Sequence, residues 1–312
     1  MVDSADAKTR RISKAVIPAA GRGTRFLPFT KSVPKELAPM VTTPTVELVV
    51  AEATAHGVTD VLVVLARGKE AVIDYFDTDP DLEAVLQAKG DDATLAAVRR
   101  AGELARIHSV EQGKPRGLGD AVAHGEEFAA GEPIAVLLPD EIIDERDQLL
   151  GPMLDVYAEH GGVVIGLADV PREDIRLYGC VVPAPGSDPH GDVVRIADMV
   201  EKPKPDEAPS TLAITGRYLL PPEIFEALRN TEPGSGGEIQ LTDAMRRLAH
   251  EGVPVHGVVF RGRRYDTGNR LEYVKAVVQF AERHDEIGAD FSAWLREYVA
   301  AGSGAAQERT GG

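Results

Sequence analysis

The stretch AAGRGTRFLPFTKSVPKE, residues 19–36, follows the apolar run KAVIP at residues 14–18. The apolar run predicts a buried strand, and the glycines after it predict a turn at the carboxyl end of that strand. A P-loop and a dinucleotide fingerprint both require a further glycine five residues after Gly21, where this chain has Phe26. The stretch is therefore neither motif, although open α/β sheets bind their ligands at this kind of turn.

The same loop is basic. It carries the cations Arg22, Arg25, Lys31 and Lys35. Glycines allow a backbone to come close to a ligand, and backbone N–H groups can then surround phosphate oxygens. Together, the glycines and cations suggest a triphosphate site. The alternative is a solvated surface loop whose cations serve solubility.

Composition narrows the possible partners. The chain has 312 residues, 43% of them hydrophobic, which suits one large α/β domain or two modest ones. Its 34 Lys and Arg against 50 Asp and Glu give a net charge of −16. Because such a protein repels polyanions at long range, we expect neither a nucleic acid nor a membrane as a partner.

Localisation follows from cysteine usage and from the first residues. Cys180 is the single cysteine, so no disulfide can form within the chain and a reducing compartment is expected. The opening MVDSADAKTRRIS has no apolar stretch typical of a signal peptide, and no run approaches the ~20 apolar residues of a membrane helix. These features favour a cytoplasmic protein.

The order of apolar runs predicts an α/β fold. Strand-like runs such as DVLVVLA, PIAVLLPD and GVVIGLA alternate with helical patterns such as VELVVAEATAHG. Nearly continuous Val, Ile and Leu are typical of a mainly parallel sheet covered by helices on both faces. We expect disordered tails at 1–13 and 301–312, a single domain at 14–284 and a C-terminal helix at 285–300. Within the domain, 77–106 predicts a helical insertion and 170–215 a small β-rich lobe.

Further blocks occur along the chain in a fixed order. They are EQGKPRGLGDAV (111–122), LLPDEI (137–142), YGCV (178–181), VEKPKP (200–205), ITGRYLL (214–220), GEIQLTDA (237–244) and YDTGN (265–269). With the opening loop, these blocks resemble the sugar-nucleotide pyrophosphorylases from residue 14 to about 284. The resemblance implies a Rossmann-like mixed, mainly parallel sheet of the nucleotide-diphospho-sugar transferase type, with a β-rich sugar lobe. One departure is Thr43-Pro44, where the family often has Lys-Pro.

The resemblance also implies a reaction, in which UTP and glucose 1-phosphate give UDP-glucose and pyrophosphate. The insertion and the phrase EIQLTDA resemble the UTP-using members more than the shorter thymidylyltransferases. Because the second pKa of a phosphate monoester is ~6, the attacking oxygen is already anionic and needs no strong base. The obstacle is repulsion between two polyanions, which cations and a metal ion can relieve. The eight histidines are scattered and show no catalytic or zinc spacing.

For the triphosphate, the resemblance implies Arg25 on the leaving phosphates and Lys35 near the α-phosphate, with Arg22 a weaker candidate. It implies a Mg²⁺ site made by Asp140, which ends an apolar strand, and Asp266. Mg²⁺ is commonly held by one or two carboxylates together with phosphate oxygens and water. Taken alone, Asp140 reads equally well as a loop carboxylate, and Asp266 as an Asx-turn or helix cap.

For the sugar phosphate, the resemblance implies that Lys202 binds the phosphate and Glu201 the sugar hydroxyls. Gly179 and Gly216 would let the backbone approach the sugar. Taken alone, the prolines of EKPKP justify only a solvent-facing turn.

For the nucleotide, the resemblance implies Gln112 at the uracil edge, because an amide offers both a donor and an acceptor. The remaining candidates supply room or backbone contacts and are Ala20, Gly21, Gly23 and Gly117.

Several alternatives stay open. A dTTP-dependent thymidylyltransferase differs only in its nucleotide, and a nucleotide-sugar sensor would bind without turnover. A dehydrogenase is disfavoured by the missing third glycine. We expect a homo-oligomer, dimer or tetramer, with the helical segment 269–300 as its interface. Cys180 is expected to be a buried thiol without a catalytic role.

Overall fold

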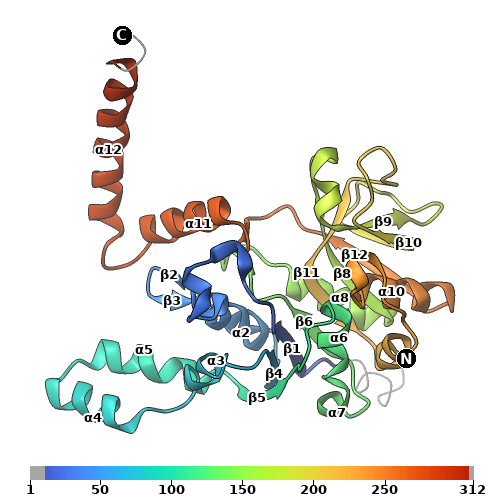
Figure 1. The fold of residues 1–312 in the computed structure, drawn as a ribbon, viewed down its shortest axis with the longest axis horizontal. Coiled ribbons are helices and arrows are strands. Elements are labelled where there is room, and N and C mark those ends of the chain that lie inside the picture. The colour runs from blue at the N-terminus through green and yellow to red at the C-terminus, as the bar shows by residue number, and fades with distance from the viewer. Residues whose placement is uncertain (1–10, 309–312) are drawn as a thin grey trace.

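A nine-stranded sheet organises residues 11–308, the part of the chain that this computed structural model describes (Figure 1). The strands lie in the order β5 (Arg106–Glu111), β4 (Asp60–Leu65), β1 (Lys14–Ala19), β6 (Ile134–Leu137), β11 (Leu212–Leu220), β8 (Val163–Asp169), β12 (Val255–Val259), β10 (Val193–Glu201) and β9 (Gly179–Pro183). Only β11 and β10 run against the rest of this sheet. The predicted mixed, mainly parallel α/β fold is confirmed.

Helices cover both faces of the sheet. The alternation of side chains along β1 shows why its sequence is apolar throughout: Ile17 packs in one core cluster and Val16 in the other. The first cluster includes side chains from α2 (Thr45–Ala55) and α8 (Leu150–His160). The second includes side chains from α6 (Leu118–Ala123), α7 (Glu126–Ala129), α9 (Glu223–Arg229) and α10 (Leu241–His250).

The loops at the carboxyl ends of the strands contain short elements that place the candidate site. After β1 come the 3-10 turns η1 (Thr24–Phe26), η2 (Phe29–Lys31) and η3 (Lys35–Leu37), then the hairpin of β2 (Pro39–Met40) and β3 (Thr43–Pro44). After β6, strand β7 (Glu141–Ile143) pairs with β13 (Arg264–Asp266), which precedes α11 (Arg270–Glu282). The predicted glycine turn at the end of the first strand is therefore present.

The helical insertion is present and ends in a strand. After α3 (Ala71–Asp74), it forms α4 (Pro80–Lys89) and α5 (Asp92–Glu103), which project from one side of the molecule (Figure 1). From Arg106 onward the chain forms β5, which pairs in parallel with β4. The sequence shows no strand signal here because β5 is a partly exposed edge strand without the apolar run of the central strands.

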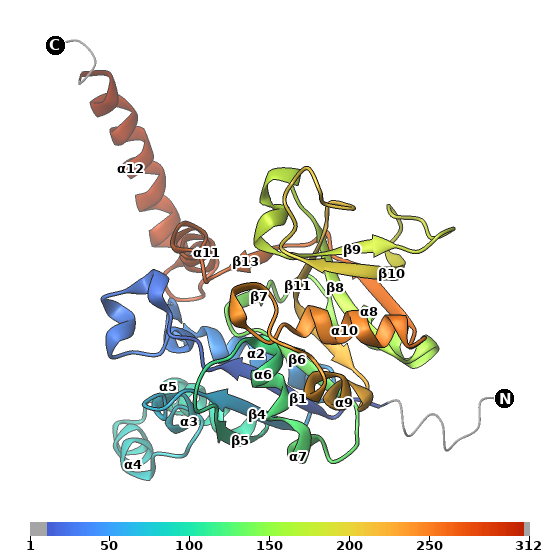
Figure 2. The same ribbon diagram turned by 45° about the vertical axis from the view of Figure 1, so that its right-hand side comes forward.

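The predicted β-rich lobe at 170–215 extends the main sheet instead of forming a sheet of its own. The 3-10 helix η4 (Arg172–Leu177) leads into β9, and β10 pairs antiparallel with both β9 and β12. Figure 2 shows β9 and β10 on the side of the molecule away from α4 and α5.

Both ends differ in part from the predicted tails. Residues 1–10 and 309–312 lie outside the described residues. Ile12 is buried in the core, so residues 11–13 belong to the body. Helix α12 (Gly288–Glu308) leads away from the body and continues through 301–308 (Figures 1 and 2), where a disordered tail was expected. The alanines of this segment favour a helix, and each glycine costs only about 1 kcal/mol.

Between residues 11 and 308, no helix combines the length and the apolar character needed to cross a lipid bilayer.

Candidate active site

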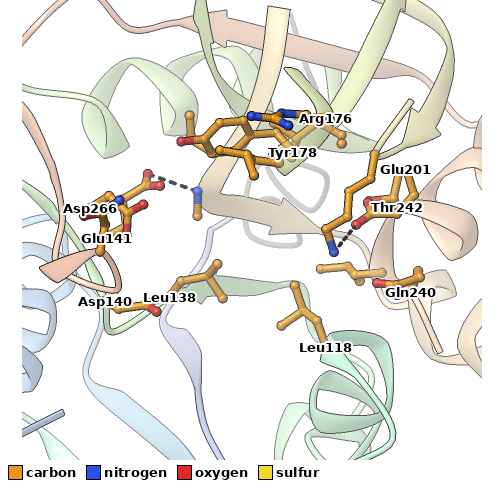
Figure 3. Close-up of a pocket in the computed structure, with 18 of the residues that line it drawn as sticks. Leu118, Leu138, Asp140, Glu141, Arg176, Tyr178, Glu201, Gln240, Thr242 and Asp266 are labelled. Atoms are coloured by element: carbon orange, nitrogen blue, oxygen red, sulfur yellow. Dashed lines mark hydrogen bonds and ion pairs between the residues drawn. The ribbon is translucent and has the colours of Figure 1, made fainter. Parts of the chain in front are cut away.

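A cavity of about 890 Å³ opens where the loops after β6 and β10 and the middle of β11 meet the start of α10 and the β13–α11 connection (Figure 3). Asp140, Glu141 and Asp266 gather at one end, and Glu201 and Thr242 lie at the other. The predicted site residues that line the cavity are Arg25, Asp140, Gly179, Glu201, Lys202, Gly216 and Asp266. We call the first end the acidic end and the second the Lys202 end.

Strand pairing brings the two distant aspartates together at the acidic end. The β7–β13 ladder places Asp266 opposite Glu141, so Asp140 lies beside it. Thr267 fixes the backbone here, because its N–H and its hydroxyl donate to the Asp140 carbonyl at 2.7 and 2.8 Å. A β-carbon at Gly268 would stand 2.9 Å from Asp140 Oδ2 and 3.0 Å from Asp266 Oδ1. The two carboxylates therefore converge on one glycine that has no room for a side chain.

Asp266 also has the local role that the sequence alone suggested for it, an Asx-turn. Its Oδ1 accepts a hydrogen bond from the Gly268 N–H at 2.9 Å, which is an Asx-turn. Asn269, in turn, caps α11 by accepting from the N–H of Leu271 at 2.9 Å. One carboxylate thus shapes the loop and lines the cavity.

The basic loop reaches the same place. Lys35 Nζ lies 2.6 Å from Asp140 Oδ2, and Arg25 Nη1 donates to the Gly268 carbonyl at 3.4 Å. Burial alone would lower the pKa of Lys35, but Asp140 and Glu36 outweigh it and hold the pKa above its usual value. Burial alone would raise the pKa of Asp140, but Lys35 holds it below its usual value. The pair is therefore ionised and poised beside the cavity.

A second half-buried lysine supports this loop. Lys69 Nζ donates to the Ala19 carbonyl at 2.7 Å and to both carboxylate oxygens of the buried Glu36, at 3.0 and 2.8 Å. Since Glu36 adjoins Lys35, this ion pair ties the start of η3 to the end of β1.

The acidic end fits a divalent cation of the magnesium type. Burial, and then the neighbouring Asp140 charge, raise the pKa of Asp266. A cation between the two carboxylates would relieve that repulsion. Glu141 is already engaged, because its Oε1 accepts from the Gly216 N–H at 3.0 Å and its Oε2 pairs with Arg264 at 2.9 Å. Within residues 11–308 no group of three or more Asp, Glu, His or Cys forms a metal cluster, so phosphate oxygens and water would complete the shell.

The Lys202 end is built on the β9–β10 ladder, which places Glu201 opposite Gly179. Glu201 accepts from the Thr242 hydroxyl at 2.7 Å, and its other oxygen lies 3.1 Å from Lys202 Nζ. Lys202 has φ 45°, in the left-handed region that side-chain-bearing residues rarely adopt. Its N–H donates to the Tyr178 carbonyl at 3.0 Å, which stabilises this backbone. Such strain is typical of functional sites.

Two glycines of the cavity are required by packing. A β-carbon at Gly179 would come within 2.9 Å of Ile214, and one at Gly216 within 2.9 Å of Leu138. That the backbone at these two glycines approaches the sugar stays a prediction. Each glycine packs against a side chain, Ile214 or Leu138, that itself lines the cavity.

The predicted nucleotide residues lie outside the cavity, along the adjoining sheet edge. Strand register aligns Ala19, Leu65 and Glu111, so Ala20 and Gln112 follow β1 and β5, the two neighbours of β4, at the same edge of the sheet. Gln112 is buried and its side-chain amide donates to Asp120 at 2.6 Å.

The three glycines proposed for the nucleotide differ in their surroundings. A β-carbon at Gly21 would meet only Lys35, at 3.9 Å, whereas Gly23 needs its positive φ of 59° to start η1. The space at Gly117 is filled, because its β-carbon would stand 2.7 Å from the Ile239 carbonyl oxygen. A side chain at Gly117 would therefore collide with the loop at Ile239, and its role in leaving room for the base stays a prediction.

Sequence reasoning missed several residues that line the cavity. Tyr178, Gln240 and Thr242 belong to the quoted blocks, so the signal was present but unassigned. Arg264 lies just before YDTGN and had no signal. Cys180, by contrast, is a buried free thiol as expected.

Comparison with known proteins agrees with this geometry. A family model described as nucleotidyl transferase matches residues 14–283. A UTP–glucose-1-phosphate uridylyltransferase from Staphylococcus epidermidis is 41% identical over 288 residues, covering 92% of this chain and 99% of that protein. A UTP-bound UGPase structure from Acinetobacter baumannii aligns with TM-score 0.84 at 36% identity, over 92% of this chain and 99% of that one. A UDP-glucose pyrophosphorylase complexed with UDP-glucose aligns with TM-score 0.80 at 36% identity, over 88% and 100%.

Proposed function

Because this chain belongs to the nucleotidyl transferase family, we propose that it transfers the uridylyl group of UTP to glucose 1-phosphate, releasing pyrophosphate. The names of its relatives and the ligands in their structures support this choice of substrates. The observation that carries it is a single cavity with a cation–carboxylate cluster at one end and Lys202 with Glu201 at the other. That arrangement suits two phosphorylated substrates placed end to end.

In the proposed reaction, an oxygen of the sugar phosphate attacks the α-phosphorus of UTP in line. The new P–O bond forms as the bond to the bridging oxygen of pyrophosphate breaks, and pyrophosphate leaves with that electron pair. No base is needed because the nucleophile is anionic. The rate gain then comes from orientation and from preorganised positive charge.

Each charged residue has a role in this scheme. Lys35, held by Asp140, meets the α-phosphate, and Arg25 at the cavity wall meets the leaving phosphates. Asp140 and Asp266 would hold Mg²⁺, which supplies charge neutralisation between the phosphates when bound.

At the opposite end, Lys202 binds the phosphate of glucose 1-phosphate and Glu201 accepts hydrogen bonds from sugar hydroxyls. Thr242 donates to Glu201 and so orients its carboxylate. Ala20, Gly21, Gly23 and Gln112 contact the nucleotide along the sheet edge. Gly117 leaves room for the base, and the loop at Ile239 packs against its other side.

The proposal includes a cytoplasmic homo-oligomer. Helices α11 and α12 expose Leu271, Val274, Trp294 and Tyr298, and the two α12 rings stack 5.2 Å apart. Exposed apolar side chains of this kind are typical of subunit contacts. Sedimentation of the intact protein, compared with Trp294→Glu, tests this part: a monomeric wild type contradicts it.

Pyrophosphate release from UTP and glucose 1-phosphate tests the activity itself, with and without Mg²⁺. The expected result is metal-dependent release that needs both substrates and falls when dTTP replaces UTP. Absence of release with Mg²⁺ present would contradict the proposed function, whereas equal rates with dTTP would reject the nucleotide assignment alone.

A further inference from the structure

Arg217 is the largest fully buried side chain in the described residues, and it lies in the middle of strand β11, which is buried along its whole length. Its guanidinium pairs with Glu52 of α2, with Nε at 3.1 Å from both carboxylate oxygens and Nη2 at 2.6 Å from one of them. Burial alone would lower the pKa of Arg217, but Glu52 outweighs it and raises the pKa. A permanent charge is therefore enclosed beneath the cavity.

The same guanidinium reaches the turn that carries Asp140. Nη2 donates to the Glu141 carbonyl at 2.8 Å, and Nη1 donates to the Leu138 carbonyl at 3.3 Å. These two carbonyls flank Asp140 on either side. Arg217 itself does not line the cavity and has no exposed surface, so it cannot touch a substrate directly.

Further hydrogen bonds hold the turn from Leu138 to Glu141. The Leu138 N–H donates to the Gly216 carbonyl at 2.9 Å, and the Glu141 carboxylate accepts from the Gly216 N–H at 3.0 Å. Thr267 anchors the Asp140 carbonyl from the other side. These hydrogen bonds leave Asp140 little freedom to move relative to Lys35 and Asp266. Arg217 connects the turn that carries Asp140 to Glu52 of α2.

Stability alone is a poor reason for this arrangement. Enclosing an ion pair has a large desolvation cost, and replacing such a pair by apolar side chains of similar volume is often neutral or stabilising. An aliphatic pair would therefore hold β11 against α2 at least as well. What an aliphatic pair cannot do is donate hydrogen bonds to the two carbonyls around Asp140.

We propose that Arg217 is a positioning residue, which sets the Asp140 carboxylate in register with Lys35 and Asp266 by clamping the Leu138–Glu141 turn. This inference rests on the proposed function. It predicts that Arg217 acts on turnover far more than on substrate affinity, because the turn meets the phosphates where charge develops, while the sugar and base sites lie elsewhere.

A double-variant comparison separates positioning from stability. Arg217→Met alone leaves Glu52 without its partner and should lower the thermal unfolding midpoint. Adding Glu52→Leu removes that charge and should restore the midpoint. In the double variant kcat should still be down about 100-fold, the loss expected from a misplacement of roughly 1 Å, with KM for both substrates nearly unchanged. Recovery of kcat together with the midpoint would overturn the proposal.

Arg217→Lys covers the case in which the double variant does not fold. Lysine keeps a charge opposite Glu52, but its single nitrogen cannot match the planar fork of donors that reaches Glu52 and both carbonyls. Turnover should fall with little change in KM. Wild-type kcat in this variant would overturn the proposal.

Arg100→Met is the matched control. Arg100 pairs with Glu47, also on α2, at 2.6 Å, but that ion pair touches no part of the Asp140 turn. It should lower the unfolding midpoint without lowering kcat; a kcat loss equal to that of Arg217→Met would show that turnover merely follows stability. If the wild type releases no pyrophosphate, the proposed function fails first, and that result is distinct from every outcome among the variants.

Discussion

The two ends of the cavity are built in opposite ways. The acidic end collects Lys35, Asp140 and Asp266 from three distant segments, and a dense set of backbone hydrogen bonds fixes them. The Lys202 end uses two consecutive residues at the end of one strand, with a strained backbone and a lysine side chain that is 47% exposed. Half-buried, paired charge suits a step in which charge must be stabilised without reorganisation. An exposed lysine suits capture and release of a substrate.

The largest effect should come from the acidic end. Asp140→Ala and Asp266→Ala should each lower kcat by about 1,000-fold or more, because each removes preorganised charge where the phosphates react. Pyrophosphate release under saturating substrates measures this. Asp147→Ala is the control, since Asp147 follows the same β7 segment but pairs with Arg263 at the surface. Near-normal turnover in both the Asp140 and the Asp266 variant would contradict the claim that the acidic end acts on the chemical step and the Lys202 end on substrate binding.

At the Lys202 end, a KM effect is expected. Lys202→Ala should raise KM for glucose 1-phosphate about 10- to 100-fold, because a charge-assisted hydrogen bond contributes roughly 1.5–3 kcal/mol. KM for UTP should stay nearly constant. Lys204→Ala offers a matched control two residues away, since Lys204 pairs with the exposed Glu207 at 3.0 Å. An effect confined to UTP would contradict the assignment.

A smaller effect concerns the backbone of that end. Lys202→Gly removes the same side chain as Lys202→Ala, but glycine accepts φ 45° without steric strain. Urea denaturation should show the glycine variant to be more stable than the alanine variant by about 1 kcal/mol. Equal stability, or greater stability of the alanine variant, would mean that the left-handed backbone is not strained.

The smallest effect lies outside both ends. His256 in β12 stacks on His160 at 4.3 Å, and its buried Nδ1 has no hydrogen-bond partner within the described part of the chain. Burial, then His160 and Arg195, lower its pKa below 6.5, while Glu159 opposes them. Between the two pKa values, His256 therefore binds a proton in the unfolded chain but not in the folded chain. Stability should be full above pH 6.5 and fall as pH drops toward the folded pKa.

His256→Phe checks this prediction, because phenylalanine keeps an aromatic ring against His160 and cannot be protonated. Its stability should change less than that of the wild type between pH 7 and 5, by up to about 1 kcal/mol, with kcat unaffected. Parallel pH curves for the two proteins would show that His256 is not the titrating group.

Sequence reasoning was most successful where one physical signal dominates. Apolar runs predicted the central strands, and the quoted blocks contained the aspartates, glycines and Lys202 that the structure brings to one cavity. It failed where tertiary pairing decides. Nothing in ITGRYLL shows that Arg217 is enclosed, because a lone arginine in a strand ordinarily faces solvent. Strand β5 was missed for the related reason that an edge strand needs no apolar run.

The acidic end is the centre of this account, and a crystal structure with UTP and Mg²⁺ tests it most directly. The account predicts phosphate oxygens within hydrogen-bonding distance of Arg25 and Lys35, and the metal ion between the carboxylates of Asp140 and Asp266. A triphosphate bound away from that cluster, with both aspartates free of metal, would contradict it.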